Sequence, residues 1–271
     1  MIICADDYGL SEDIDQAIIE LCGLRRLSAV SCMVALERCD AAALAKLIRH
    51  QAAVDIGLHL SFADETLPRP VNAVAGSSPP YFTAYGPYLR RALAGRVPAR
   101  ETFQQVSEQY ELFLKKCGRP PDFIDGHLHA HQLPGVRHGL IDFVLSLPAN
   151  RRPYIRNTRG PLRKLWRARL PLFKAAIIGA FGRRMHAQLV AARLFTNEGF
   201  TGIYDFRNWR RYPEYFPRFA ASLPDPNGLL VVHPGGREDW RRQEFTTLRE
   251  FRFAPGSPNR FQPQAIRTSG N

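Results

Sequence analysis

Short apolar runs and amphipathic stretches alternate along most of the chain. Runs of consecutive apolar residues predict buried strands, and apolar residues that recur at spacings of three and four predict helices. The predicted strands cover residues 2–5, 29–35, 54–58, 123–124, 154–156, 202–206 and 229–232. The predicted helices cover residues 11–23, 41–49, 101–117 and 134–147, and a further segment at 212–223 separates the last two strands. This order is typical of an α/β fold built on a parallel sheet.

The ends of the predicted helices carry suitable capping residues. Ser11 precedes the first helix as an N-cap, and Glu12 and Asp13 follow in the first turn, where the helix dipole stabilises acidic side chains. Gly23 ends this helix, and Gly118 ends the helix at 101–117. The local signals therefore agree with the hydrophobic pattern.

Two stretches break the pattern. From Leu67 to Tyr88, Pro, Gly, Ser and aromatic residues replace the periodic spacing, and a stretch longer than an ordinary connection predicts a lid or a substrate loop. Residues 254–271 change in a similar way and are predicted to form a flexible tail. Residues 1–253 are then predicted to be a single domain, which fits a chain of 271 residues with 45% hydrophobic content.

Cysteine usage and charge add to this picture. The five cysteines are widely spaced and form no C-x-x-C pair, so we interpret them as reduced, mostly buried thiols of a cytoplasmic protein. The first residues do not resemble a secretory signal, and no run reaches the length of a membrane span. Residues 151–193 contain twelve Lys or Arg and no Asp or Glu, so this segment accounts for the whole net charge of +12.

Five predicted strands run into side chains that can carry chemistry. These side chains are Asp6 and Asp7, His59, Asp125 and His127, Arg156, and His233. Because active sites of α/β barrels and sheets lie at the carboxyl ends of parallel strands, we predict that they converge in one site. Each also has an ordinary explanation by itself: a helix cap and turn for the aspartates, a hydrogen-bonded core residue for His59, and a turn for His233.

The run from Phe123 to His131 holds three imidazoles and one carboxylate. Histidine is the commonest metal ligand and titrates near neutrality, so this density predicts a metal or proton-transfer site. In an extended chain all three histidines face one way, whereas in a helical turn only His127 and His131 do. The spacing leaves both alternatives open, and it leaves His129 and His131 as supporting, substrate-contacting or solvated residues.

Several segments resemble the YdjC-like carbohydrate deacetylases. Residues 5–11 are similar to the family's opening Ala-Asp-Asp-Phe-Gly-Leu-Ser, and residues 27–34 resemble its second strand. Residues 57–60 match its Gly-Leu-His-Leu, and residues 125–131 resemble its Asp-Ser-His-His-His-Val-His. The late His233-Pro234-Gly235 also has a counterpart, so the resemblance runs in order from residue 2 to about residue 250. The sequence departs from the family at Leu128, where an adjacent histidine is usual, and in the basic segment.

The resemblance implies a distorted TIM-like (β/α) barrel that removes the N-acetyl group from an amino sugar or glycan. Asp7, His59 and His127 would hold one divalent cation, Mg²⁺ or Zn²⁺, with open positions for water and substrate. Asp6 would be the general base, and His233 would protonate the leaving amine. The residues expected to contact substrate are Arg156, His131, Tyr81 and Tyr85. The two tyrosines would stack on a sugar ring, with packing of their loop onto the barrel as the alternative.

Two other functions compete with this one. Residues 125–129 also resemble the metal motif of amidohydrolases, but that motif normally lies on the first strand, and Asp6 and Asp7 would then have no role. The basic segment is also compatible with a nucleic-acid- or membrane-binding protein, although no nucleic-acid-binding motif accompanies it.

The basic residues at 157–193 are interleaved with Leu, Trp, Phe and Ile. This mixture favours an amphipathic insertion that contacts anionic lipid at the inner face of the membrane, where the sugar would be lipid-linked. A solvated basic helix is the alternative. We predict no nucleic acid partner, and the sequence assigns no oligomeric state.

Overall fold

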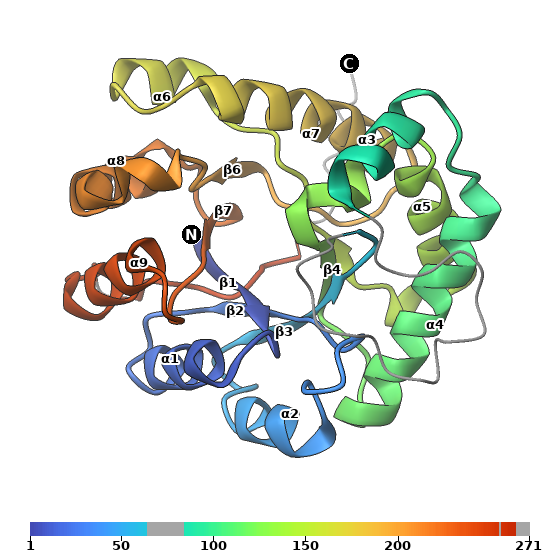
Figure 1. Cartoon of the computed structure of the whole chain (residues 1–271), viewed down its shortest axis with the longest axis horizontal. Coiled ribbons are helices and arrows are strands. Elements are labelled where there is room, and N and C mark those ends of the chain that lie inside the picture. Colours follow the sequence, from blue (N-terminus) through green and yellow to red (C-terminus); the bar gives the residue numbers. More distant parts are fainter. Residues whose placement is uncertain (64–83, 255, 264–271) are drawn as a thin grey trace.

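The computed structural model describes residues 1–63, 84–254 and 256–263. In this part of the chain, seven parallel strands form one sheet in the order β5-β4-β3-β2-β1-β7-β6. The sheet curls, and helices cover its outer side (Figure 1). The strands are β1 (Ile2–Tyr8), β2 (Ala29–Cys32), β3 (Asp55–Leu60), β4 (Phe123–Gly126), β5 (Tyr154–Ile155), β6 (Gly199–Thr201) and β7 (Gly228–Val232).

Nine α-helices lie among the described residues, and four of them correspond to the helices predicted at 11–23, 41–49, 101–117 and 134–147. They are α1 (Glu12–Gly23), α2 (Ala41–Ile48), α3 (Tyr85–Leu93), α4 (Ala99–Cys117), α5 (Val136–Ser146), α6 (Leu162–Arg167), α7 (Phe173–Ala191), α8 (Tyr212–Ser222) and α9 (Asp239–Glu250). Short 3₁₀ segments cover His127–Gln132, Ala149–Arg151 and Phe206–Arg211. The Ser11 hydroxyl accepts the Ile14 N–H at 3.4 Å and caps α1, as predicted.

The two edges of the sheet approach each other. Ile155 in β5 forms a parallel bridge with Thr196, just before β6. The Asn197 side chain bonds both the N–H and the carbonyl of Asn157 across the same seam, at 2.8 Å and 3.0 Å. The predicted fold class, an α/β protein with a distorted TIM-like (β/α) barrel, is confirmed.

The two faces of the strands have different neighbours. Ile3 and Ala5 pack in the large core with the helices, whereas a smaller apolar cluster fills the interior of the barrel. This interior cluster is formed by Ile2, Cys4, Ala29, Phe123, Tyr154, Phe200, Leu229 and Val231. Because side chains alternate along a strand, the next inward positions of β1, β3, β4, β5 and β7 lie directly above this layer. Those positions are Asp6, His59, Asp125, Arg156 and His233.

The first strand breaks its alternation at Asp7. Asp7 has φ of +70°, and the register between β1 and β2 shifts between Ala5 and Tyr8. Asp is among the residues that tolerate this left-handed conformation best, and such bulges redirect side chains near active sites. As a result, Asp6 and Asp7 both face the same end of the barrel.

The strand predicted at 202–206 is wrong, because β6 covers Gly199–Thr201 instead. Gly202 has φ of +107°, and a side chain there would collide with the backbone of Val231. The strand therefore ends before Gly202, and the chain continues into the 3₁₀ segment at Phe206–Arg211.

Part of the segment predicted as a tail, residues 256–263, contacts the barrel. Arg260 forms an ion pair with Asp55, and the Phe261 ring stacks on Tyr154 with 4.1 Å between ring centroids. Asp55 and Tyr154 begin β3 and β5, so these contacts cover the end of the barrel opposite the predicted site. The polar composition of this segment gave no indication that Phe261 packs, partly buried, against the apolar cluster of the barrel interior.

Candidate active site

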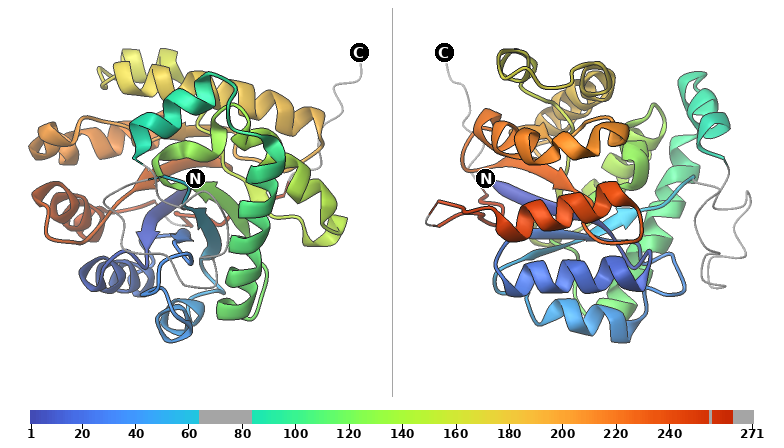
Figure 2. Two further views of the ribbon diagram at one scale, coloured as in Figure 1. Left: turned by 45° about the vertical axis from the view of Figure 1, so that its right-hand side comes forward. Right: turned by 60° about the vertical axis from the view of Figure 1, so that its left-hand side comes forward.

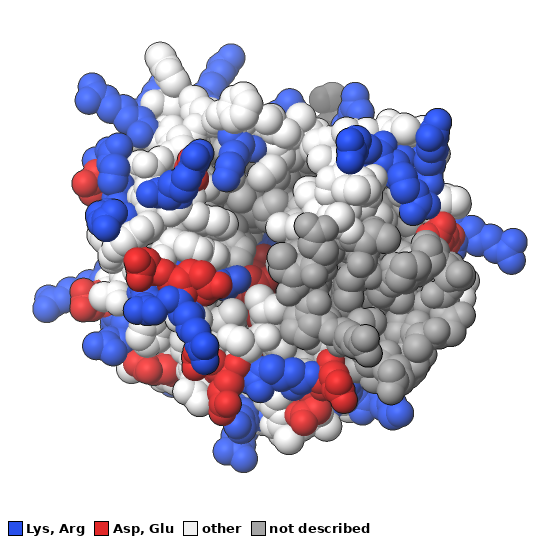
Figure 3. Space-filling model, viewed as in Figure 1, with Lys and Arg blue, Asp and Glu red and all other residues white. Residues whose placement is uncertain are grey.

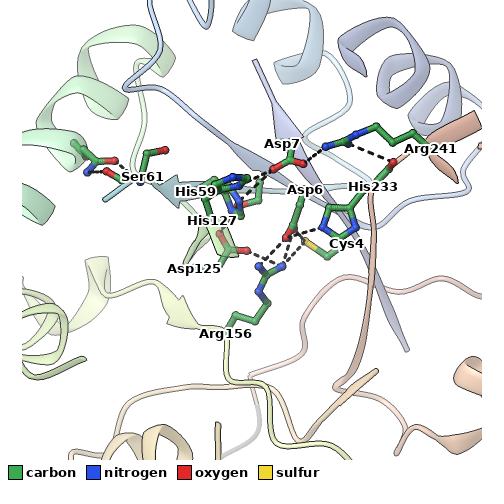
Figure 4. A network of polar contacts seen from close by, with 12 residues as sticks. Cys4, Asp6, Asp7, His59, Ser61, Asp125, His127, Arg156, His233 and Arg241 are labelled. Carbon is green, nitrogen blue, oxygen red and sulfur yellow. Dashed lines mark hydrogen bonds and ion pairs between the residues drawn. The ribbon is translucent and has the colours of Figure 1, made fainter. Parts of the chain in front are cut away.

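The polar side chains at the strand ends converge as predicted (Figure 4). Asp6, Asp7, His59, His127 and His233 all line one cavity of about 740 Å³. A cavity of this volume is in the range of small-molecule sites. Its remaining lining residues are Leu10, Tyr85, Leu128, His129, Lys174, Ile178, Gly202, Ile203, Tyr204, Phe206, Glu238, Trp240 and Arg241.

Asp7, His59 and His127 form a compact cluster of metal-binding atoms. One ligand atom from each lies within 4.8 Å of the others. The Asp7 Oδ1 atom is 3.1 Å from His127 Nδ1 and 3.5 Å from His59 Nε2. Arg241 donates to the other Asp7 oxygen at 2.6 Å, which leaves Oδ1 directed at the histidines.

The orientation of His59 is set by residues behind it. Its Nδ1 atom lies 2.6 Å from Asp125 Oδ1, and the Ser31 hydroxyl donates to the same carboxylate oxygen. A carboxylate behind a histidine fixes the ring and its tautomer, so that the other nitrogen faces the site. Asp125 was recognised in the sequence as a strand-end residue, but its orienting role and that of Ser31 were not predicted.

The charges around this cluster suit a divalent cation. Burial alone would lower the pKa of His59, but the nearby carboxylates of Asp125 and Asp6 outweigh it and raise the pKa to about 10. Among the described residues, the buried carboxylates at this cluster are those of Asp6, Asp7 and Asp125. They pair with only two guanidinium groups, those of Arg156 and Arg241. Two imidazoles and one carboxylate are also a common donor set for catalytic metals. The residues therefore fit one divalent metal ion.

Asp6 lies beside this cluster and is held by Arg156. The Arg156 guanidinium donates to both Asp6 oxygens, at 2.7 Å and 2.8 Å, and pairs with Asp125 at 2.9 Å. Burial would raise the pKa of Asp6, but the charge of Arg156 outweighs it and holds the pKa below its usual value. Asp6 is therefore ionised at neutral pH with both oxygens fixed in place.

His233 faces Asp6 from β7. Its Nε2 atom is 3.9 Å from Asp6 Oδ2, and its ring makes edge contacts with Phe206 and Trp240. Burial lowers the pKa of His233 to about 4. The imidazole is therefore neutral at pH 7, and it can accept a proton from one group and give it to another.

Glu244 on α9 supports His233 from behind. Its Oε2 atom accepts the His233 backbone N–H at 2.6 Å, and its Oε1 atom accepts the Tyr204 hydroxyl at 2.8 Å. Glu244 is 1% exposed, and burial raises its pKa from 4.5 to about 7. The folded state favours the protonated carboxyl of Glu244. The contribution of this group to folding stability is therefore complete below about pH 4.5 and is lost as the pH rises through about 7.

We expect Glu244→Gln to remove this pH dependence. Between pH 5 and pH 8, the wild type should lose about 3 kcal/mol of stability relative to the variant, because glutamine does not titrate. Urea unfolding of both proteins at several pH values measures the difference. Glu250→Gln, on the exposed end of the same helix, is the matched control. Parallel pH profiles for the wild type and Glu244→Gln would contradict the argument.

The residues predicted to contact substrate have different positions. Tyr85 lines the cavity, and its hydroxyl donates to the Leu128 carbonyl at 3.3 Å. Arg156 and His131 are fully buried and do not line the cavity, and the His131 Nε2–H donates to the Arg156 carbonyl at 2.9 Å. Tyr81 lies outside the described residues, as does most of the predicted loop at 67–88.

The histidine run is neither extended nor regularly helical. It forms a short 3₁₀ segment in which Leu128 and His129 both have positive φ. This geometry brings His129 to the cavity and turns His131 inward, so neither periodicity considered in the sequence applied. Arg241, Trp240 and Phe206 were also missed, because they lie in helical segments and no strand-end signal marks them.

The fold and the site define a parallel α/β barrel with an Asp-His-His cluster at the carboxyl ends of its strands. The chain belongs to the YdjC-like protein family, whose model matches residues 1–255. A chitooligosaccharide deacetylase of Escherichia fergusonii is 29% identical over 137 residues, which are 50% of this chain and 52% of that protein. The match thus spans about half the length of that relative.

A solved structure shares the fold. It is the crystal structure of a proposed cellobiose-phosphate cleavage protein from Enterococcus faecalis V583, with a TM-score of 0.63 and 16% sequence identity. The similarity covers 92% of this chain and 89% of the other. It therefore extends over nearly the whole barrel.

Proposed function

We propose that this protein is a metal-dependent hydrolase that removes the N-acetyl group from an amino sugar or glycan. The observation that carries the proposal is the pairing of an ionised Asp6 with the Asp7-His59-His127 cluster on the floor of one cavity. Hydrolysis of an amide needs an activated water, a proton acceptor and a proton donor for the leaving nitrogen. The floor of the cavity presents candidates for each.

The cation would be held by Asp7 Oδ1, His59 and His127. When bound, a divalent metal supplies a Lewis acid that lowers the pKa of water and polarises a carbonyl group. Asp125 and Ser31 hold His59 in the orientation that this requires. Imidazole ligands are common for Zn²⁺, whereas Mg²⁺ prefers oxygen ligands, so Zn²⁺ is the better match of the two predicted metals.

Asp6 accepts the proton of the water whose oxygen attacks the acetyl carbon. The C–N bond then breaks, acetate leaves with the water oxygen, and the sugar nitrogen must gain a proton. The neutral imidazole of His233, 3.9 Å from Asp6, is placed to take the proton from Asp6 and pass it to this nitrogen. Arg156 contributes to these reaction steps only through Asp6, because it fixes the two oxygens of Asp6 while its own side chain has no exposed surface.

The upper walls of the cavity suit a sugar ring. Phe206 and Trp240 stack with ring centroids 3.9 Å apart on one wall, and Tyr85 comes from α3. Aromatic faces and sugar C–H groups pack without loss of hydrogen bonds, and the polar floor would then meet the acetamido group. We retain Tyr85 as a substrate contact and replace His131 and Arg156 in that role with Trp240 and His129.

The proposal is tested by acetate release from soluble chitooligosaccharides after Zn²⁺ or Mg²⁺ is added to metal-free protein. We expect acetate and free amine in equal amounts, with no release in the presence of a chelator. An O-acetylated sugar of the same size is the control for nonspecific esterase activity. If folded, metal-loaded protein released no acetate from any N-acetylated sugar, free or lipid-linked, the proposed reaction would be wrong.

A further inference from the structure

The helices α6 and α7 present a surface that is both apolar and basic. Four large apolar side chains protrude from it: Trp166 is 68% exposed, Phe173 80%, Ile177 49% and Val190 48%. The same segment carries eight exposed cations, namely Arg163, Lys164, Arg167, Arg169, Lys174, Arg183, Arg184 and Arg193. We call these twelve side chains the α6–α7 surface. In Figures 1 and 2 the two helices lie along one outer edge of the molecule.

The apolar residues of this surface are not needed for the core. α7 packs on the barrel through the opposite side, which buries Gly179, Gly182, Met185 and Leu189. Phe173 and Ile177 are spaced by one helical turn and point away from those residues. Large exposed apolar patches rimmed by polar residues mark interaction sites, whereas single exposed apolar residues do not.

The charges of these cations are largely unpaired among the described residues, where Asp205 interacts electrostatically with Lys174. In the described part of the chain, no carboxylate forms an ion pair with any of the eight. Figure 3 shows Lys and Arg side chains along the upper edge, over α6 and α7, while Asp and Glu gather mainly in the lower half. The surface is therefore complementary to an anionic partner.

This surface borders the entrance of the cavity. Lys174 and Ile178 on α7 line the cavity, and Phe173 is the neighbour of Lys174 in sequence. The Lys174 ammonium lies 5.9 Å from the centre of the Phe206 ring on the cavity wall. A partner bound to α6 and α7 would therefore lie next to the opening through which substrate enters.

We propose that the α6–α7 surface docks on an anionic lipid bilayer and brings the cavity to acetylated sugars carried on lipids. Protruding Trp and Phe among Lys and Arg are typical of segments that insert shallowly at a membrane interface. Binding of RNA or DNA would account for the cations of this surface but not for its four exposed apolar side chains. Among the described residues no helix is long and apolar enough to cross a membrane, so the contact is peripheral. The lipid-linked substrate rests on the proposed deacetylase activity, while the docking itself does not.

Vesicle co-sedimentation tests the docking without any substrate. We expect binding to vesicles that contain phosphatidylglycerol, little binding to pure phosphatidylcholine, and weaker binding at high salt. The triple variant Arg163→Gln, Lys164→Gln and Arg167→Gln should bind at least about tenfold more weakly. The matched control removes three exposed cations, from α2, its C-cap and α4, through Lys46→Gln, Arg49→Gln and Lys115→Gln, and should bind like the wild type.

Tryptophan fluorescence reports the apolar part of the contact. Emission should shift to shorter wavelength when vesicles are added, and the shift should disappear in Trp166→Phe while Trp209 and Trp240 remain. Equal vesicle binding by the wild type and the triple α6 variant would overturn the proposal. If that variant still released acetate from a soluble sugar at the normal rate, the docking proposal alone would be wrong and the proposed deacetylase activity would stand.

Discussion

Replacing His59 or His127 with alanine is expected to abolish metal binding and acetate release together. Each histidine provides one of the three ligand atoms that lie within 4.8 Å of one another. Changes to residues that only support a ligand typically cost 10- to 100-fold in affinity or activity, so loss of a ligand should cost more than about 100-fold. Elemental analysis of protein dialysed against equimolar metal, together with the acetate assay, measures both effects.

The control for these variants is His138→Ala, which removes an exposed imidazole of α5 that does not line the cavity. It should keep both metal and activity. Circular dichroism should show that all three variants are folded, because the rest of the barrel core is untouched. Unchanged metal content in both His59→Ala and His127→Ala would remove these residues from the proposed ligand set.

The convergence of the site could be predicted because side chains alternate between the two faces of a strand. Each strand presents alternate residues to the barrel interior, so Cys4 and Asp6, or Val231 and His233, share one face. The apolar runs located the strands, and the polar residue after each run marked the same end of the barrel. This is why Asp6, His59 and His233 were found without knowledge of the fold.

The rest of the site depends on local geometry that hydrophobic patterns do not record. Asp7 joins the site because β1 bulges, and His129 reaches the cavity because the chain turns through positive φ. The family resemblance implied that Arg156 contacts substrate, yet its side chain is enclosed by Asp6 and Asp125. The partners that bury Arg156 come from strands distant in the sequence, so the residues next to Arg156 in the chain could not reveal that it is buried.

Replacing Asp6 with asparagine is expected to preserve metal binding while reducing turnover. Asparagine has nearly the same shape but cannot take a proton from water, and loss of a general base typically costs about 10²- to 10⁴-fold in rate. Asp6 is not part of the Asp7-His59-His127 cluster, so metal content should stay that of the wild type. Both quantities come from the same two measurements that test His59 and His127.

The variant must also remain folded for this result to be informative. Arg156 donates to both oxygens of Asp6, so in Asp6→Asn one donor would face another, at a cost of about 1–3 kcal/mol. Arg156 keeps Asp125 as a buried partner, which should limit the loss, and urea unfolding measures it. Asp13→Asn, an exposed change on α1, is the matched control and should leave rate and metal content unchanged. If Asp6→Asn retained full turnover, proton transfer in this site would have to be assigned to another residue, and His233→Ala would be the next variant to assay.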